Sequence, residues 1–309
     1  MADQGERFVK VAMGPLLSHE DRYGGDAVAG AARRIWVAER ARLGPSADKG
    51  RTADVAELAQ IAGWLLFDAG RKHAARLAFA DSHALAVRAG DRPREWFALD
   101  MLAMHAVATA DPRQALALSE ELLTRPGIPP RVALLARVRQ ARALAQTGER
   151  ARALEAMRWA QGGLQDSLTP RDPAWTWWVD ETEVLGHEAQ MLLAMGEPAA
   201  AVPLFHRVNE TLPAGRAALY HSVAELTAQT HAAAWPEAAT TLTRTAHLLT
   251  TVSSTRSTTH LHHTLRTLAR KAPRWLSDHM RDTLRAAAKG GQWPTCSRTC
   301  SPARDAAPR

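Results

Sequence analysis

Hydrophobic residues recur along most of the chain at helical spacing, and the segments that carry them come in pairs. Five stretches share one layout, in which an apolar helical segment is followed by a turn of small residues and a second apolar segment. These stretches are residues 56–89, 96–125, 134–163, 182–213 and 219–249. No segment alternates between apolar and polar residues for long enough to form a strand. The pattern predicts an all-α fold made of repeated helix pairs.

Small residues occupy equivalent positions in the five stretches. Five residues after the small residue of each turn stands an alanine, namely Ala75, Ala115, Ala153, Ala201 and Ala238. The position where paired helices cross holds, in chain order, Gly63, Ala103, Ala141, Ala189 and Leu226. A bulky side chain at these positions would force the paired helices apart. The pattern resembles the tetratricopeptide repeat, which implies a right-handed α-solenoid of about five helix pairs.

The rest of the chain flanks this repeat region. In chain order we expect an N-terminal helical cap (1–50), the repeat solenoid (51–255), basic C-terminal capping helices (256–289) and a disordered tail (290–309). The first cap contains a predicted helix over 26–43, and the second contains predicted helices over 258–271 and 275–289. Solenoids need such caps to cover their end faces. Glycines and prolines over 162–178 predict a long loop between the third and fourth pairs.

Several short strings carry a second resemblance. In chain order they are Asp21–Gly25, Glu57–Trp64, Phe67–Arg71, Ala89–Arg92, Pro173–Trp175 and Asp180–Glu181. With these strings, residues 16–255 resemble the C-terminal tetratricopeptide region of actinobacterial helix-turn-helix regulators of the xenobiotic-response-element type. Only 15 residues precede the matching part, too few for the DNA-binding domain with which such regulators begin. The resemblance implies the sensing or assembly half of a regulator, either acting alone or as a truncated product.

Positive charge is concentrated at the end of the chain. The formal net charge is +7, yet residues 256–309 hold 11 Lys and Arg against three Asp, and residues 1–255 have a net charge of −1. An alternative function is therefore nucleic-acid binding by the closing helices. The candidate residues are Arg266, Arg270, Lys271, Arg274, Arg281 and Arg285. The competing interpretation is a solvated cap face whose arginine stems cover apolar surface.

Composition also bears on the location of the protein. No apolar run is long enough to span a bilayer, and the N-terminus lacks the apolar core of a secretory signal. We therefore expect a cytoplasmic protein without a membrane partner. Arginine outnumbers lysine 34 to 5 and alanine is abundant, which indicates a high-GC, actinobacterial source.

Motifs that would indicate an enzyme are missing from the sequence. It has no phosphate-binding glycine loop, no dinucleotide fingerprint and no nucleophile elbow. Asp180, Glu181 and Glu183 lie beside three tryptophans. This cluster favours either a carboxylate with a raised pKa for acid–base chemistry or a helix N-terminus with packing aromatics. We expect a non-enzymatic protein without a cofactor, with an enzyme built around residues 175–183 as a further alternative.

Histidines and cysteines do not form a recognisable metal motif. The pair His187-Glu188 lacks a second histidine one turn later, where Met191 stands, so we expect a pair on the helix surface. A denser cluster, expected on a solvated face, is formed by His260, His262 and His263. Cys296 and Cys300 lie in the predicted tail without a second pair, as adventitious thiols or a redox switch. No metal site is predicted.

The resemblance to tetratricopeptide units also indicates where a partner binds, because stacked units place their first helices on the inner, concave face. The inward positions are Gln60, Trp64, Phe67, Asp68, Phe97, Asp100, Met104, Arg142, Gln146, Glu183, Gln190, Tyr220, Thr227 and His231. This mixture suits a peptide, a protein segment or a small effector, and a second copy of the chain is also a possible partner. Alternatively, Trp64, Phe67 and Phe97 are ordinary core residues. We expect a ligand to change the curvature of the solenoid and thereby act on transcription through a partner.

Overall fold

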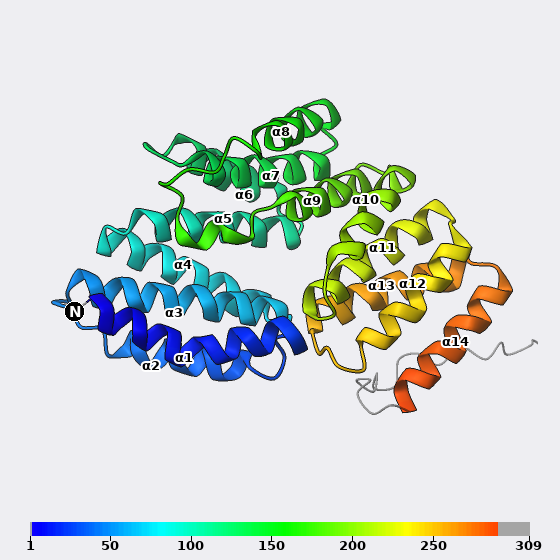
Figure 1. Cartoon of the computed structure of the whole chain (residues 1–309), viewed down its shortest axis with the longest axis horizontal. Helices are drawn as coiled ribbons and strands as arrows, with labels where there is room; N and C mark the ends of the chain where they lie inside the picture. The colour runs from blue at the N-terminus through cyan, green and yellow to red at the C-terminus, as the bar shows by residue number, and fades with distance from the viewer. Residues whose placement is uncertain (1, 290–309) are drawn as a thin grey trace, which may run out of the picture.

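The computed structural model describes the backbone of residues 2–289, with side chains for residue 9 and residues 11–286, and every regular element in this range is a helix (Figure 1). In chain order the helices are α1 (Ala2–Tyr23), α2 (Ala29–Ala41), α3 (Lys49–Asp68), α4 (Lys72–Ala89), α5 (Arg92–Ala108), α6 (Pro112–Thr124), α7 (Pro130–Gln146), α8 (Arg150–Gly163), the 3-10 helix η1 (Ala174–Trp178), α9 (Glu181–Ala194), α10 (Pro198–Thr211), α11 (Arg216–Ala232), α12 (Trp235–Leu248), α13 (Thr255–Lys271) and α14 (Arg274–Lys289). The predicted tail, residues 290–309, lies outside the described residues. Across the described residues, no helix has both the length and the apolar character needed to cross a bilayer.

The five predicted helix pairs are present as α3/α4, α5/α6, α7/α8, α9/α10 and α11/α12, and consecutive helices pack against one another. The five alanines placed at equivalent positions by the sequence are all fully buried: Ala75, Ala115, Ala153, Ala201 and Ala238. At the crossing of α3 and α4, a Cβ atom on Gly63 would lie 2.5 Å from Cε1 of Phe79. The prediction of an all-α fold with close contacts at these positions is therefore confirmed.

The turns inside the pairs share one backbone conformation. The small residue predicted at each turn has a positive φ, and these residues are Gly70, Ala110, Gly148, Gly196 and Ala233. Alanine rarely adopts this left-handed region, because its Cβ approaches the following carbonyl oxygen. Within the described residues, Ala110 and Ala233 are the non-glycine residues with positive φ. Their strain is tolerated because the helices on either side are held by packing.

The ends of the chain differ in part from the prediction. The N-terminal cap is predicted with one helix over 26–43, and the structure adds α1, which runs through Gly14-Pro15 and packs on α3. Val9 and Met13 of α1 are buried in the same cluster as the apolar side chains of α3. The helix predicted over 26–43 is α2, and the two closing helices are α13, which packs on α11, and α14, which packs on α12.

The chain curves so far that its first and last helix pairs meet. Helix α1 contacts α11, and α3 contacts α13, so that the end of α1 lies beside the segment that links α12 to α13 (Figure 1). Backbone hydrogen bonds join the two segments: the N–H of Ser253 donates to the carbonyl of Tyr23 at 2.7 Å, and the N–H of Asp26 donates to the carbonyl of Ser253 at 3.3 Å. We call this contact the closure.

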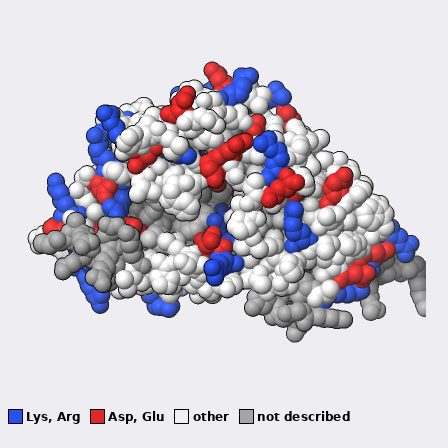
Figure 2. Space-filling model, viewed as in Figure 1, with Lys and Arg blue, Asp and Glu red and all other residues white. Residues whose placement is uncertain are grey.

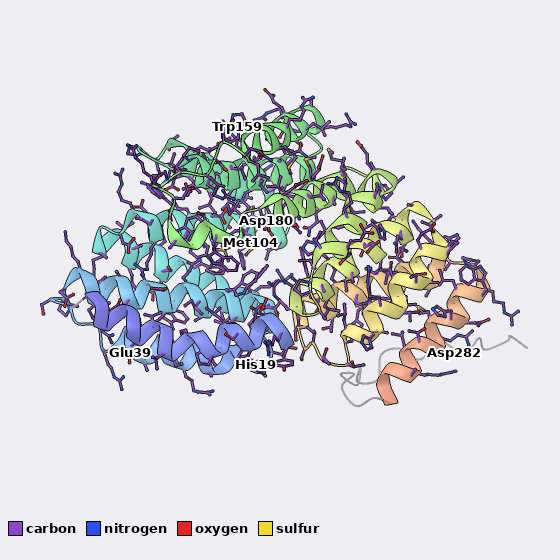
Figure 3. The ribbon with its side chains drawn as sticks, viewed as in Figure 1. His19, Glu39, Met104, Trp159, Asp180 and Asp282 are labelled. Carbon is purple, nitrogen blue, oxygen red and sulfur yellow. The ribbon has the colours of Figure 1, made fainter. Side chains whose placement is uncertain are left out.

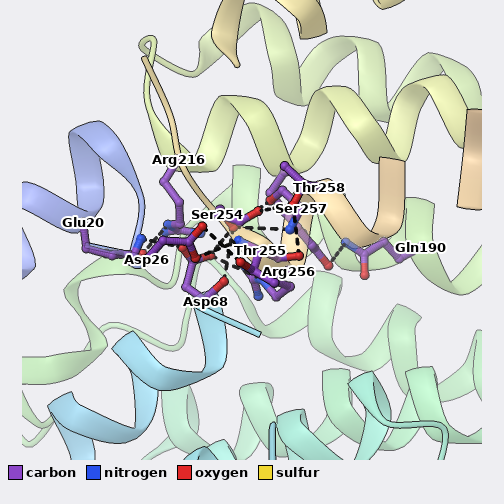
Figure 4. A network of polar contacts seen from close by, with 12 residues as sticks. Glu20, Asp26, Asp68, Gln190, Arg216, Ser254, Thr255, Arg256, Ser257 and Thr258 are labelled. Atoms are coloured by element: carbon purple, nitrogen blue, oxygen red, sulfur yellow. Dashed lines mark hydrogen bonds and ion pairs between the residues drawn. The ribbon is translucent and has the colours of Figure 1, made fainter. Parts of the chain in front are cut away.

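Two carboxylates hold the closure through side-chain hydrogen bonds (Figure 4). Asp26 accepts from the N–H of Thr255 at 2.9 Å and from the hydroxyl of Ser253 at 2.9 Å. Asp68, whose side chain is fully buried, accepts from the N–H of Gly25 at 2.8 Å and from the hydroxyl of Ser254 at 2.9 Å. Segments more than 180 residues apart in sequence are thus joined by polar contacts.

The predicted loop between the third and fourth pairs contains η1 and lies against α5. Trp175 of η1 stacks on Phe97 of α5, with ring centroids 4.4 Å apart, and its Nε1–H donates to the carbonyl of Pro93 at 3.0 Å. Arg131 of α7 donates to the carbonyl of Val179 at the end of the loop. The loop is therefore an ordered part of the fold that covers one side of Phe97.

The close approach of α3 and α4 yields a first prediction. We expect Gly63→Ala to lower the free energy of unfolding by up to about 2 kcal/mol, because overpacking costs about 1–3 kcal/mol and alanine's helix propensity offsets about 1 kcal/mol. Gly162→Ala in α8 is the matched control, since a Cβ atom there meets nothing within 4 Å. Urea unfolding of both variants measures the difference. Equal stability of the two variants would show that the crossing is not tightly constrained.

A second prediction concerns the closure. Gly24 has φ +84°, and a Cβ atom on it would collide with the carbonyl of Ser253. We expect Gly24→Ala to separate the two segments and to speed hydrogen exchange of the Ser253 and Asp26 amides at least tenfold. Gly90→Ala is the control, because Gly90 has φ +71° but nothing within 4 Å of such an atom. If both variants exchange these amides at the wild-type rate, the closure does not depend on the approach at Gly24.

Candidate functional site

The first helices of the pairs, together with α13, contribute side chains to one connected set on the inside of the curve. Contacts run from α5 to α7, from α7 to α9, from α9 to α11, from α11 to α13, and from α13 back to α3. Figure 3 shows Met104 of α5 near the middle of the molecule, whereas Trp159 of α8 lies at its outer edge. The space-filling view shows the surface hollowed near the middle of this face (Figure 2). We call this set of side chains the inner face.

A buried ion pair joins α5 to α7. Asp100 is fully buried and accepts from Nε of Arg139 at 3.0 Å and from Nη2 at 3.1 Å. Burial would lower the pKa of Arg139, but the Asp100 carboxylate outweighs it and raises that pKa. This two-point contact fixes the guanidinium plane, and the remaining Nη1 of Arg139 lies 2.7 Å from Nε2 of His187.

Histidine 187 of α9 connects two arginines to a glutamate. Arg142 Nη1 lies 2.9 Å from His187 Nδ1, and His187 Nε2 lies 2.9 Å from Oε1 of Glu183. Arg139 Nη1 lies 2.7 Å from the same Nε2, so each ring nitrogen of His187 faces an arginine, whose N–H groups can only donate. Burial lowers the pKa of His187, and the two nearby arginines lower it further against the pull of Glu183. The histidine is therefore neutral and lies between Arg139, Arg142 and Glu183.

The ionisation of Glu183 follows from the same surroundings. Burial alone would raise its pKa, but His187 and Arg139 outweigh burial and hold the pKa at about 2. Glu183 is thus a carboxylate under ordinary conditions, and 30% of its side chain is exposed on the inner face. General acid catalysis requires a carboxyl group with a raised pKa, whereas the pKa of Glu183 is lowered.

Tyr220 of α11 lies between α9 and α13. Its hydroxyl accepts from Nε2 of Gln190 at 2.8 Å, and the guanidinium of Arg256 lies 4.3 Å from its ring centroid. Arg256 also lies 4.8 Å from the ring of Phe67 and 5.4 Å from the ring of Trp64. Cation–π contacts of this kind hold the guanidinium in place without neutralising it. The closure therefore places Arg256 of α13 in contact with the aromatic side chains of α3 and α11.

A second arginine of α11 contacts the same tryptophan. Arg216 lies 4.9 Å from the ring of Trp64, and its Nε is 2.6 Å from Oε1 of Glu20 on α1. Burial raises the pKa of Glu20, and the positive charge of Arg216 opposes this effect. Two arginines thus lie against Trp64, and each is within ion-pair distance of a carboxylate: Arg216 of Glu20, and Arg256 of Asp68.

Histidines of the last two inner helices are also enclosed. His260 of α13 lies 3.1 Å from the hydroxyl of Thr227, and burial, with His263 and Arg256 adding to it, lowers its pKa to about 4. Burial likewise lowers the pKa of His221 to about 4, where the ring packs against Gly186. Both side chains are therefore neutral in the folded protein at pH 7.

Many of the residues predicted from the sequence meet on the inner face, and the contacts above include Trp64, Phe67, Asp68, Asp100, Arg142, Glu183, Gln190, Tyr220 and Thr227. Met104 packs against the apolar cluster of α3. Gln60 is buried, and neither of its amide atoms has a hydrogen-bond partner. Phe67 and Asp68 are themselves buried, so they support the inner face from behind.

Like Gln60 and Met104, three further predicted residues do not share these polar contacts. Phe97 is stacked against Trp175, so a partner does not reach that side of its ring. Gln146 donates to the carbonyl of Val107 at 2.9 Å, near the end of α7. His231 is exposed at the end of α11. The loop before α9 covers this side of Phe97, and the placement of Phe97 in a binding groove stays a prediction.

Sequence reasoning missed several residues of the inner face, namely Glu20, Arg139, His187, Arg216, His221, Arg256 and His260. Helical spacing could have found three of them. Arg139 lies three residues before Arg142, and His187 lies four residues after Glu183, so each pair shares one helix face. Arg216 precedes Tyr220 by the same interval. Glu20 and Arg256 depend on the closure, for which the sequence carries no local signal.

Two predictions about histidines are wrong. His187 is not part of a pair on the helix surface, since only 15% of its side chain is exposed and it contacts Glu183, whereas Glu188 accepts from Gln161 at 2.6 Å. His260 does not lie on a solvated face, because it turns toward Thr227, while His263 is exposed. Within the part of the chain that the structure describes, no group of three or more His, Cys, Asp or Glu side chains could hold a metal ion.

The acids beside the tryptophans take separate roles. Asp180 accepts from the N–H of Glu183 at 2.9 Å and thereby caps α9, as the helix N-terminus interpretation expects. Glu181 is exposed and pairs with Arg207 at 3.3 Å. Trp177 is 83% exposed. Of the three acids, Glu183 alone contributes to the inner face.

The basic residues considered for nucleic-acid binding are all exposed on α13 and α14: Arg266, Arg270, Lys271, Arg274, Arg281 and Arg285. Arg281 pairs with Asp278, and Arg285 lies 3.5 Å from Asp282 on the same helix. Arg256, the first basic residue of the segment, is instead directed to the inner face. Part of the positive charge of this segment is thus neutralised locally or lies inside the curve.

Comparison with known proteins leaves the family open. No family model matches the sequence, and no curated protein matches it.

The enclosed histidine of α13 yields a prediction about pH. His260 has a pKa of about 4 in the folded protein and the ordinary value of 6.5 when unfolded. Between these values the unfolded chain binds a proton that the folded protein does not, so stability falls as pH drops from 6.5 toward 4. We expect His260→Gln to reduce the loss of stability between pH 7 and pH 5 by about 1–2 kcal/mol.

Urea unfolding at the two pH values measures this effect, with His263→Gln on the exposed side of the same helix as control. A loss of stability in His260→Gln as large as that in the wild type would contradict the assignment of a buried, neutral ring.

Proposed function

We propose that the protein is a non-enzymatic interaction module that binds a peptide, a protein segment or a small effector on its inner face. In this proposal the helix pairs form a right-handed solenoid of tetratricopeptide-like units, and the first helices of successive units line a concave groove. The observation that carries the proposal is the convergence of side chains from α3, α5, α7, α9, α11 and α13 on one connected, partly exposed set.

The chemical character of this set supports recognition of an extended ligand. Trp64 and Tyr220 offer half-buried aromatic surface, while Gln190 and Glu183 offer polar groups along the same face. Interfaces commonly combine aromatic and arginine side chains of this type at their centre with polar groups around them. An ordinary solenoid core would instead be apolar throughout, because unneeded buried charges destabilise a fold.

A role in transcription is part of the proposal and rests on the sequence strings. Two of these strings, Asp21–Gly25 and Phe67–Arg71, lie at the closure, where Gly25 and Asp68 contact each other. The resemblance to regulators with a tetratricopeptide region therefore concerns the segments that set the curvature of the molecule. A ligand on the inner face would favour one curvature and thereby change the surface offered to a coupled partner.

The test is a selection from a random peptide library against the full chain. We expect enriched peptides whose affinity falls at least tenfold in the double variant Met104→Ala with Tyr220→Ala, because both side chains lie on first helices of the pairs. The matched control replaces two exposed side chains of second helices, Leu77→Ala with Trp159→Ala, and should bind as the wild type does. Isothermal titration calorimetry provides the affinities.

Two outcomes would contradict the inner face as the binding site. One is the enrichment of peptides that lose affinity in the control variant and keep it in the inner-face variant. The other is the absence of any enriched peptide at concentrations that detect micromolar binding. Circular dichroism of both double variants establishes that they remain helical before the comparison is made.

A further inference from the structure

Several arginine N–H groups in the middle of the inner face have no hydrogen-bond acceptor. Of the four arginines that meet there, three have a carboxylate within ion-pair distance: Arg139 at 3.0 Å, Arg216 at 2.6 Å and Arg256 at 3.5 Å. Arg142 has no ion pair among the described residues, and its contact is the uncharged Nδ1 of His187. Its Nε is buried and lacks a hydrogen-bond partner.

The nearby carboxylates are already engaged. Asp100 is held by two contacts from Arg139, and Oε1 of Glu183 lies 2.9 Å from Nε2 of His187. Asp68 accepts from the closure, through Gly25 and Ser254. A charged guanidinium enclosed by protein without a direct counter-charge destabilises the free protein. In agreement with this, burial lowers the pKa of Arg142 to about 10, although Tyr220 and Glu183 oppose the shift.

Arg256 has spare donors as well. Its Nε and Nη2 are buried without a hydrogen-bond partner, and the 3.5 Å separation from Asp68 is an ion pair rather than a hydrogen bond. The three aromatic rings around it hold the guanidinium but accept no conventional hydrogen bond. The hydroxyl of Tyr220 accepts from Gln190, so its own proton is free to donate to a further acceptor.

These donors are linked through neighbouring residues of α9 and α11. Arg142 contacts His187, the hydroxyl of Tyr220 accepts from Gln190 three residues later on α9, and the guanidinium of Arg256 lies 4.3 Å from the ring centroid of Tyr220. The groups come from α7, α11 and α13, so a ligand that bound all three would bridge the two halves of the curve. Arginine forks match the two oxygens of a carboxylate or the oxygens of a phosphate better than any neutral group.

We propose that Arg142, Arg256 and Tyr220 form a subsite for the anionic end of a ligand, a carboxylate or a phosphate, with its apolar part against the ring of Trp64. This inference deepens the proposed function and rests on it, since it names the chemistry that the inner face recognises. The uncompensated charge of Arg142 is retained because the ligand supplies the missing counter-charge.

The experiment uses the full chain and two random tetrapeptide pools that are identical except for a free or an amidated C-terminus. Peptides retained after equilibrium dialysis are quantified by mass spectrometry, and inorganic phosphate is titrated separately by calorimetry. We expect one of two results. Either the free-acid pool is retained at least tenfold more than the amidated pool, or phosphate binds the wild type and does not bind Arg142→Met. The first result assigns the subsite to carboxylates and the second assigns it to phosphates.

Two variants distinguish a binding role from a structural one. Arg142→Met should abolish the anion preference and leave the thermal midpoint of the free protein equal to or above that of the wild type, because an uncompensated charge is removed. Arg139→Met, three residues away, should lower the midpoint, because it leaves Asp100 buried without a partner. Anion binding that persists in Arg142→Met, or a midpoint that falls as far in that variant as in Arg139→Met, would overturn the proposal.

Failure of this inference is separable from failure of the proposed function. If library peptides bind the inner face but acid and amide forms bind equally, and phosphate does not bind, the anionic subsite is wrong and the proposed function stands. If neither peptides nor phosphate bind at all, both proposals fail together.

Discussion

The buried carboxylate of Asp68 is the interaction on which the shape of the molecule depends. An ionised group without access to water is tolerated only when hydrogen-bond donors and positive charge surround it. Those partners come from two distant places, the backbone N–H of Gly25 and the side chains of Ser254 and Arg256. Only the closed arrangement of the helix pairs provides all of them at once. The energetic requirement of one carboxylate thereby selects a curvature that neighbour-to-neighbour packing alone leaves free.

The inner face exists as a site because of that curvature. In an array of helix pairs each unit contacts its neighbours, and side chains of the first and last units have no reason to meet. Here Arg256 of α13 reaches the rings of Trp64 and Phe67 on α3, and Arg216 of α11 reaches Glu20 on α1. Residues from both ends of the chain therefore share one electrostatic environment, in which histidines are kept neutral and Glu183 is kept ionised.

Sequence patterns were sufficient for the helix pairs and insufficient for the site, and the reason is the range of the contacts. Fully buried Ala75 and the close approach at Gly63 reflect packing between adjacent helices, which leaves a periodic signal in the sequence. The partners of Asp68 lie 43 and 186 residues away, and no spacing rule relates such positions. The stacking of Trp175 on Phe97 joins a loop to a helix 78 residues earlier, and no spacing rule predicts this contact either. Composition misled in one respect, since Arg256 counts toward a basic cap segment but belongs to the interior.

Arg256 takes part in both the closure and the proposed subsite, and this double role has a thermodynamic consequence. An anion bound to its guanidinium would weaken its attraction to Asp68, because one positive charge would then be shared between two negative groups. The same anion would gain from Arg142, which has no counter-charge in the free protein, so binding would remove one unfavourable term while it weakened another. By linkage, whatever the ligand does to the strength of the closure, the closure does to the affinity of the ligand. The magnitude of that coupling is limited to what Arg256 contributes between α13 and α3, namely the ion pair with Asp68 at 3.5 Å and the cation–π contacts with Trp64 and Phe67. A change in curvature on binding would therefore be a modest shift between closed and opened forms rather than a collapse of the helix pairs, whose own packing does not involve Arg256.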